Sequence, residues 1–262
     1  MRRVEQLLRA TAIAEARHFW FRGFRAFVTP LVLRAIAGRR DPLLLDCGCG
    51  TGANVELLGR FGRAFGFDLS GIGLRIGLEA GRTRLVRATV TAAPFRGAGF
   101  DVVTSFDVLY SLESADERGA IAEMYRLLKP GGFAIVNVAA MDILRGDHSA
   151  FAGEVRRYSR GELRARLEAA GFEVVRLTYT NAALVAPLAV LRLLQRRRGI
   201  RKETTAQLEI LVPPAPINAL MTGVLRLEGL WLRWFDAPFG SSLLCLARKP
   251  VATTGPTETH DV

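Results

Sequence analysis

A short apolar run that ends at an acid and a glycine-rich turn constrains the fold of this chain more than any other feature. Three leucines, Leu43 to Leu45, follow Asp41-Pro42 and predict a strand buried on both faces, as in a parallel sheet. Asp46 ends the run, and glycines then alternate with small residues over 48–52. Glycine adopts positive φ easily and lets a bound molecule lie against the backbone. A helix predicted over 54–60 would point free N–H groups at this turn.

The turn is of a nucleotide-binding type, but its spacing excludes two common kinds. No Lys-Ser/Thr pair follows the glycines, so it is not a P-loop. The pattern Gly48-x-Gly50-x-Gly52 also differs from the Gly-x-Gly-x-x-Gly of dinucleotide folds. Asp46 stands where a carboxylate meets a cationic ligand. A second acid, Asp68, ends the next apolar run at about the spacing of an acid that binds a ribose diol.

Several segments, in order, resemble the motifs of one enzyme family. Residues 43–52 resemble motif I of the class I S-adenosylmethionine-dependent methyltransferases, and Asp68 matches their ribose-binding acid. The stretch 93–103 resembles their Leu-Pro-Phe and Phe-Asp-Val-Val pair. Residues 106–110 resemble the segment after the fourth strand, and 128–132 resemble the turn before the fifth. The chain is similar to the bacterial small-molecule subgroup of this family, of type 11 or 12.

The resemblance implies S-adenosyl-L-methionine as cofactor and S-adenosyl-L-homocysteine as its product. The residues expected to bind the cofactor are Asp46, Gly48, Cys49, Gly50, Gly52, Asp68, Leu69, Thr89, Val90, Phe106, Asp107, Trp20 and Arg25. One position departs from the family pattern, because Thr89 stands where an acid usually accepts from the adenine amine. A hydroxyl accepts that hydrogen bond more weakly than a carboxylate, and the N–H of Val90 remains available to the ring.

Strand and helix patterns alternate regularly from Leu43 onward. Strands are predicted at 43–46, 64–68, 85–88, 100–105, 133–139, 174–179 and 242–247. Helices are predicted at 54–60, 71–80, 116–127 and 160–170. The fold class is therefore α/β, a doubly wound, seven-stranded, mostly parallel sheet with a Rossmann-like methyltransferase fold. An N-terminal helical cap and a helical insertion between strands six and seven complete it, and in the family the seventh strand runs antiparallel.

The expected domain organisation follows from these patterns. It comprises an N-terminal helical cap or lid at 1–40, a cofactor-binding core at 41–180, a helical insertion at 181–240, the last core strand at 241–250 and a disordered tail at 251–262.

The N-terminal region contains an unusually aromatic stretch, 18–25, between helical patterns over 2–17 and 27–37. A proline near the start of the second pattern is expected to break that helix. Two interpretations stay open: a helical cap packed on the sheet, or a lid that closes over the cofactor. In the lid, Trp20 or Phe21 would screen the sulfonium through cation–π attraction, and Arg22 or Arg25 would reach the cofactor's carboxylate.

Two catalytic candidates lie in the loop 141–158. His148 is a candidate general base because imidazole titrates near neutral pH, and the alternative is a solvated loop histidine. Tyr158 ends an Arg-Arg-Tyr sequence that resembles a turn of the same bacterial subgroup, where it is either a structural anchor or a substrate contact. No set of metal ligands is recognisable, and methyl transfer needs none.

The chain is basic, with a formal charge of +11 and 36 lysines and arginines. A basic surface favours nucleic acid, anionic lipid or acidic substrates, but an arginine-rich composition throughout is an equal alternative. The one dense basic cluster spans 192–202. Three cysteines are too few for a disulfide framework, and Cys47-x-Cys49 is too close for a usual zinc knuckle. With no signal peptide visible, a cytoplasmic location is expected.

The partner expected from the resemblance is a small-molecule, secondary-metabolite, sugar or lipid-like acceptor, with the acceptor atom (O, N or C) open. One alternative is a nucleic-acid methyltransferase, which only the charge suggests; the missing Asn-Pro-Pro-Tyr-type motif after the fourth strand argues against the adenine-N6 DNA class. The other is a family fold that catalyses another reaction such as cyclisation. The insertion 181–239 admits four roles: substrate cap, dimer face, peripheral membrane hairpin or extra core. Monomer and homodimer both remain open.

Overall fold

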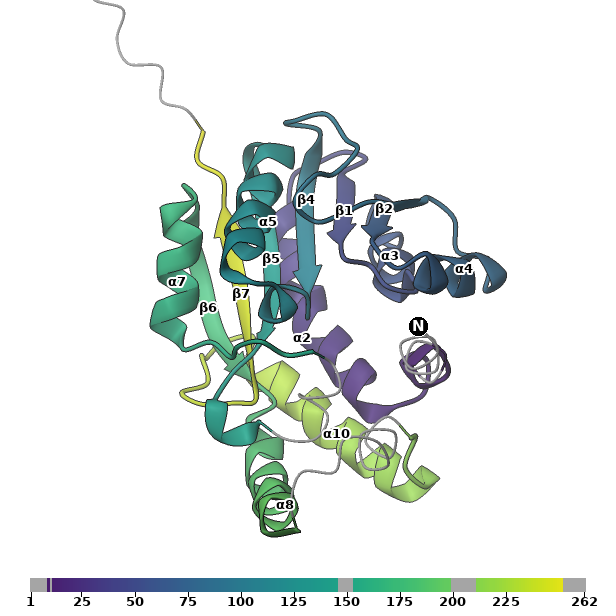
Figure 1. The fold of residues 1–262 in the computed structure, drawn as a ribbon, viewed down its shortest axis with the longest axis vertical. Coiled ribbons are helices and arrows are strands. Elements are labelled where there is room, and N and C mark those ends of the chain that lie inside the picture. Colours follow the sequence, from purple (N-terminus) through teal and green to yellow (C-terminus); the bar gives the residue numbers. More distant parts are fainter. Residues whose placement is uncertain (1–8, 10, 146–152, 199–210, 252–262) are drawn as a thin grey trace, which may run out of the picture.

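The computed structural model describes residues 9, 11–145, 153–198 and 211–251. Its strands are β1 Leu43–Cys47, β2 Arg63–Asp68, β3 Leu85–Arg87, β4 Phe100–Phe106, β5 Leu128–Ala139, β6 Glu173–Thr180 and β7 Ser242–Arg248. They form one sheet in the order β3-β2-β1-β4-β5-β7-β6. Strand β7 is antiparallel to β5 and β6, and the other pairs are parallel. This confirms the predicted mostly parallel, doubly wound sheet (Figure 1).

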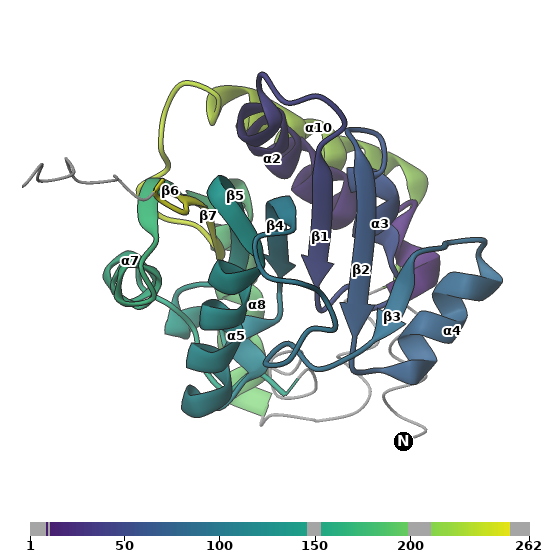
Figure 2. The same ribbon diagram turned by 90° about the horizontal axis from the view of Figure 1, so that it is seen from above.

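Helices cover both faces of the sheet. Those longer than one turn are α2 Phe19–Ile36, α3 Ala53–Leu58, α4 Gly71–Glu79, α5 Ser114–Leu127, α7 Arg160–Ala169, α8 Val185–Arg198 and α10 Ala215–Trp231. Helices α2 and α10 lie on one face, and α5 and α7 lie on the other (Figure 2). Neighbouring strand residues point to opposite sides, so Leu44 packs in the core beneath α2 and Leu45 in the core beneath α5.

The parallel strands place their carboxyl ends at one edge of the sheet. Ligands of open α/β sheets bind at this edge. The glycine-rich turn after β1, the acid that ends β2 and the residues after β4 all lie there. The fold therefore brings together segments that are separated in the sequence.

The predicted helix break at Pro30 is wrong, because α2 runs without interruption through this residue. His18 caps the helix, and its Nδ1 accepts a hydrogen bond from the backbone N–H of Trp20 at 3.1 Å. Proline removes one backbone hydrogen bond and strains the preceding turn. Burial of Val28 and Val32, both fully excluded from solvent, holds the helix against the sheet and outweighs that loss.

The Leu-Lys-Pro-Gly-Gly segment that begins at Leu128 also differs from the prediction. It was expected as a turn before the strand, but β5 starts at Leu128 and includes it. Phe100 pairs with Leu128 and Val102 pairs with Phe133, so the register shifts across this segment. The segment is therefore an irregularity inside the strand, because a proline and two glycines bulge without ending the pairing.

The predicted insertion between strands six and seven contains α8 and α10. Helix α10 packs along α2, where Asn218 accepts a hydrogen bond from the N–H of Phe19 at 2.8 Å and donates one to the carbonyl oxygen of Arg17 at 2.9 Å. No helix within the described ranges is long and apolar enough to span a membrane. The basic cluster at 192–202 lies largely outside the described side chains, and the tail from residue 252 lies outside the described residues.

Candidate functional site

The glycine-rich turn is held against β2 by its own backbone. The N–H groups of Gly48 and Cys49 both donate to the carbonyl oxygen of Phe67, at 2.9 and 3.0 Å. Gly48, Gly50 and Gly52 have φ of +80°, +55° and +80°. A Cβ on Gly48 would overlap the side chain of Val108, whereas a Cβ on Gly50 would meet no atom within 4 Å. Position 48 therefore needs glycine for conformation and space, and position 50 faces open space.

Asp68 joins the turn to the start of α4. Its Oδ2 accepts from the N–H of Gly50 at 2.8 Å, and its Oδ1 accepts from the N–H of Ser70 at 2.7 Å. Asp68 is half-buried. Each carboxylate oxygen has a second lone pair, so the group retains the capacity to accept from a ligand. The predicted ribose-binding acid thus also fixes the shape of the turn.

Asp46 lies fully buried at the end of β1. Its Oδ1 accepts from the Thr104 hydroxyl at 2.6 Å, and its Oδ2 has no hydrogen-bond partner. Burial raises the pKa of Asp46 to about 7; the Thr104 hydrogen bond opposes this shift, and the nearby Asp68 adds to it. A buried, unpaired carboxylate oxygen is unfavourable by itself. The residues beside the turn therefore fit a ligand that carries a donor or positive charge.

Asp107 follows Phe106, which ends β4 and meets the ring of Phe24 edge-on at 5.0 Å between centroids. Asp107 has a φ of +60°, and its Oδ1 accepts from Asn137 Nδ2 at 2.9 Å. Solvent reaches this residue, yet protein atoms crowd its carboxylate. This desolvation raises the pKa of Asp107 to about 6, with a further contribution from Glu154, while the Asn137 hydrogen bond opposes it. Asp107 is thus a carboxylate suited to exchanging a proton near neutral pH.

The residues predicted to lie near the adenine follow the carboxyl ends of β2 and β3. Leu69 follows Asp68 and is 65% exposed. The Thr89 and Thr91 hydroxyl oxygens lie 3.0 Å apart, so Thr89 has a hydrogen-bond partner on its own loop. Val90 is partly buried against the core. The structure thus brings the predicted adenine-side residues to the same sheet edge as Asp68.

The two N-terminal cofactor candidates, Trp20 and Arg25, make their contacts within the N-terminal region and the core rather than with the glycine-rich turn. Trp20 lies within α2 and packs partly against the core beneath that helix. Arg25 donates from Nη2 to the carbonyl oxygen of Glu15 at 2.9 Å and lines a groove between α2 and α10. This packing favours the helical cap over the mobile lid.

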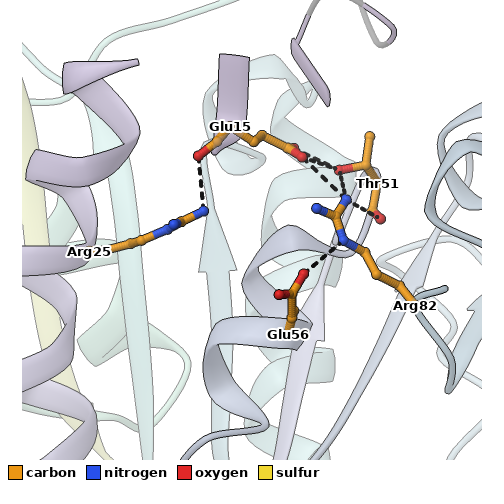
Figure 3. A network of polar contacts seen from close by, with 5 residues as sticks. All are labelled: Glu15, Arg25, Thr51, Glu56 and Arg82. Carbon is orange, nitrogen blue, oxygen red and sulfur yellow. Dashed lines mark hydrogen bonds and ion pairs between the residues drawn. The ribbon is translucent and has the colours of Figure 1, made fainter. Parts of the chain in front are cut away.

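Sequence analysis missed a buried network that docks the N-terminal segment on the turn (Figure 3). The Thr51 hydroxyl donates to the Glu15 carboxylate, whose oxygens lie 2.6 and 2.8 Å away. Arg82 Nη1 donates to Glu15 at 3.3 Å and to the Thr51 carbonyl oxygen at 3.1 Å, and its Nε reaches Glu56 at 3.2 Å. Burial raises the pKa of Glu15, and its hydrogen bonds oppose that shift. The sequence feature that could have indicated this network is Glu15, a charged residue among apolar positions of the helical pattern over 2–17.

Replacing Thr51 with valine should loosen the N-terminal segment. The change leaves the buried Glu15 carboxylate without its closest donor, which costs about 1–3 kcal/mol. Hydrogen exchange should become faster over 11–17, while Thr51→Ser, which keeps the hydroxyl, should exchange like the wild type. Equal protection of this segment in all three proteins would show that the network does not hold it.

Of the two catalytic candidates of the loop, Tyr158 lies within the described residues. The Tyr158 hydroxyl donates to Glu117 at 2.5 Å and is 2% exposed. Glu117 is fully buried and also pairs with Arg156 and Arg166. Burial and Glu117 raise the pKa of Tyr158, so the geometry favours a structural anchor rather than a catalytic group. His148 lies outside the described residues.

Comparison with known proteins gives a consistent result for the core. Residues 45–136 match a family profile described as "Methyltransferase domain". "Probable tRNA methyltransferase 9B" of Mus musculus is 34% identical over 101 residues, which are 38% of this chain and 22% of that protein. The "Ubiquinone/menaquinone biosynthesis C-methyltransferase UbiE" of Klebsiella pneumoniae subsp. pneumoniae is 33% identical over 110 residues, 37% of this chain and 43% of that protein. The matches thus cover less than half of either relative.

The fold agrees with a solved structure over a larger part of the chain. A SAM-dependent methyltransferase from Archaeoglobus fulgidus superposes with a TM-score of 0.54 at 14% identity, covering 86% of this chain and 93% of that one. At this identity the likeness concerns the fold alone. The matching profile covers the same turn, acids and strands that form the site described above. Residues 45–136 therefore form a methyltransferase domain, and the chain has the fold of the class I S-adenosylmethionine-dependent methyltransferases.

Proposed function

We propose that the protein transfers a methyl group from S-adenosyl-L-methionine to a small-molecule or lipid-like acceptor, with S-adenosyl-L-homocysteine as product. The assignment of this cofactor rests on the carboxylates beside the glycine-rich turn. The unpaired Asp46 oxygen and the half-buried Asp68 carboxylate lie on either side of a turn whose Gly50 faces open space. These groups suit a ligand that combines a cationic end with a diol.

The proposed roles follow the position of each group. Asp68 accepts from the ribose hydroxyls, and Asp46 balances the charge at the amino-acid end. Thr89 and Val90 meet the adenine. The remaining proposed cofactor contacts are Gly48, Cys49, Gly50, Gly52, Leu69, Phe106, Asp107, Trp20 and Arg25. When bound, the cofactor supplies a methyl group already activated as a sulfonium.

Asp107 is the group proposed to act on the acceptor side. Its carboxylate accepts a proton from the acceptor's O–H or N–H as the nucleophile forms its new bond. Asn137 orients the carboxylate through its 2.9 Å hydrogen bond, and Tyr110 and Glu154 lie close enough to interact with it electrostatically. A pKa of about 6 leaves the group mostly ionised at pH 7.5 and able to accept a proton.

The rate of methyl transfer should therefore rise with pH through about 6 and then level off. Asp107→Asn keeps a similar shape but cannot accept the proton, so kcat should fall about 100-fold and this inflection should vanish. Asp142→Asn, which changes an acid of the loop after β5, is a suitable control. An unchanged pH–rate profile in Asp107→Asn would remove Asp107 from this role.

The acceptor class is inferred from the relatives. The quinone-biosynthesis relative supports a lipid-like small molecule, while the tRNA methyltransferase relative and the charge of +11 support an RNA acceptor as the second candidate. The protein should be incubated with methyl-labelled cofactor and, separately, a metabolite extract, a lipid extract and total tRNA. Label in small molecules or lipids supports the proposal, and label in tRNA alone contradicts it. Cofactor binding without any S-adenosyl-L-homocysteine formation would favour a non-methylating reaction.

A further inference from the structure

Helix α10 exposes the side that an amphipathic helix normally buries. The face turned toward the protein carries small or polar residues together with one leucine: Asn218, Thr222, Leu225 and Gly229. The face turned to solvent carries large apolar residues, with exposed fractions from 45% to 67%: Ile217, Leu220, Leu227, Leu230 and Trp231. Trp234, three residues beyond the end of the helix, continues this face and is 82% exposed. Such a contiguous apolar surface marks an interaction site.

The pattern has a clear structural cause. Leu225 packs against Gly23 of α2, and a Cβ on Gly229 would lie 3.3 Å from the Cβ of Ala26. Small residues therefore let α10 approach α2 closely. The large apolar side chains are left on the outer side, where spacings of three, four and seven residues align them along the helix.

A basic groove adjoins this apolar face. It lies between α2 and α10, has a volume of about 1070 Å³ and is lined by arginines with no acidic side chain among the described residues that form it. The side chains of five lining arginines form no hydrogen bond or ion pair within the described part of the chain: Arg22, Arg34, Arg60, Arg226 and Arg233. Leu230 and Trp234 belong to both the groove and the apolar face.

We propose that the apolar face of α10 and the basic groove together dock the protein on an anionic lipid bilayer. Bilayer phosphates complement the unpaired arginines, and the exposed leucines reach the acyl boundary. Trp231 and Trp234 each combine an apolar ring with one polar N–H, which suits the headgroup region. A second copy is a poorer occupant, because a symmetric contact would bring the unpaired arginines of both copies toward one another.

The test is sedimentation of the full chain with vesicles, without cofactor or acceptor, so its outcome is independent of methyl transfer. The vesicles contain phosphatidylcholine alone or with about one third phosphatidylglycerol, at about 0.1 M and 0.5 M salt. One variant carries Leu227→Ser and Trp231→Ser, and another carries Arg226→Glu and Arg233→Glu. Matched controls on α4 are Leu78→Ser, at a residue 58% exposed, and Arg75→Glu. All the changed side chains are exposed, and circular dichroism verifies that each variant folds.

The wild type should sediment with the anionic vesicles, be released by high salt and bind phosphatidylcholine at least tenfold more weakly. Both α10 variants should bind the anionic vesicles at least tenfold more weakly, since each arginine near such a surface contributes a factor of about five. The α4 controls should bind like the wild type.

Four results would overturn the proposal. One is equal binding of the wild type to neutral and anionic vesicles, and another is loss of binding in the α4 controls to the same degree. The third is a wild-type dimer that the Leu227→Ser/Trp231→Ser variant converts to monomer, which would make this face a self-interface. Competition by tRNA that the apolar substitutions leave unchanged would assign the groove to nucleic acid and likewise contradict membrane docking.

Discussion

Replacing Asp68 with alanine should lower the affinity for S-adenosyl-L-methionine at least 100-fold. The change removes the proposed acceptor of two ribose hydroxyls, and charge-assisted hydrogen bonds are worth about 1.5–3 kcal/mol each. It also frees the N–H groups of Gly50 and Ser70, which Asp68 holds at 2.8 and 2.7 Å. Loss of ligand contacts and loss of turn geometry therefore act in the same direction.

Isothermal titration calorimetry measures this effect, and Asp68→Asn separates its two causes. The amide keeps one oxygen acceptor without the charge, so its affinity should lie between those of the wild type and Asp68→Ala. Thermal unfolding without ligand reports on the turn alone. An Asp68→Ala protein that folds normally and binds the cofactor with wild-type affinity would contradict the assignment.

Replacing Gly48 with valine should abolish cofactor binding and destabilise the domain. The residue has a φ of +80°, which costs about 1–2 kcal/mol for an L-residue, and its side chain would overlap Val108. Gly50→Val shares the backbone strain, since Gly50 has a φ of +55°, but its side chain would meet no protein atom within 4 Å and would obstruct the ligand more than the fold. Both variants should therefore lose binding, but Gly48→Val should lose much more stability.

Two measurements distinguish the variants: urea unfolding for stability and calorimetry for binding. Adding Val108→Ala to Gly48→Ala should restore part of the lost stability, since it relieves the overlap but not the strained backbone. Wild-type binding in Gly50→Val would mean that the ligand does not lie against the turn. Equal stability of Gly48→Val and Gly50→Val would mean that Val108 does not limit position 48.

The sheet edge that forms the site was predictable because local sequence patterns encode it. The run Leu43–Leu45, the acids that end the first two strands and the glycine spacing are all local features, and they led to the observed sheet edge. The bounds of β2 and β7 differ from prediction by one residue each, because backbone pairing with β1 and β5 extends over the charged residues Arg63 and Arg248. The fold follows from these strands and the helices between them.

Long-range contacts explain what the sequence could not reveal. Glu15 meets Thr51 and Arg82 across 36 and 67 positions, and no local pattern encodes such a pairing. Tyr158 similarly contacts Glu117 across 41 positions, and this buried contact favours the structural anchor over the catalytic role. The apolar pattern of α10 was visible in the sequence, but the close approach of Gly229 to α2 determines that its larger apolar side chains remain exposed.

Calorimetric titration of the wild-type protein with S-adenosyl-L-methionine, at pH 6 and pH 7.5, tests the central claim most directly. Asp46 has a pKa of about 7 when no ligand pairs with it, so at pH 6 it must release a proton before it balances a cationic ligand. Binding should therefore be one-to-one and about eightfold tighter at pH 7.5, with proton release at pH 6 and no such pH dependence in Asp46→Asn. Absence of binding at both pH values, for the cofactor and for S-adenosyl-L-homocysteine, would contradict the account.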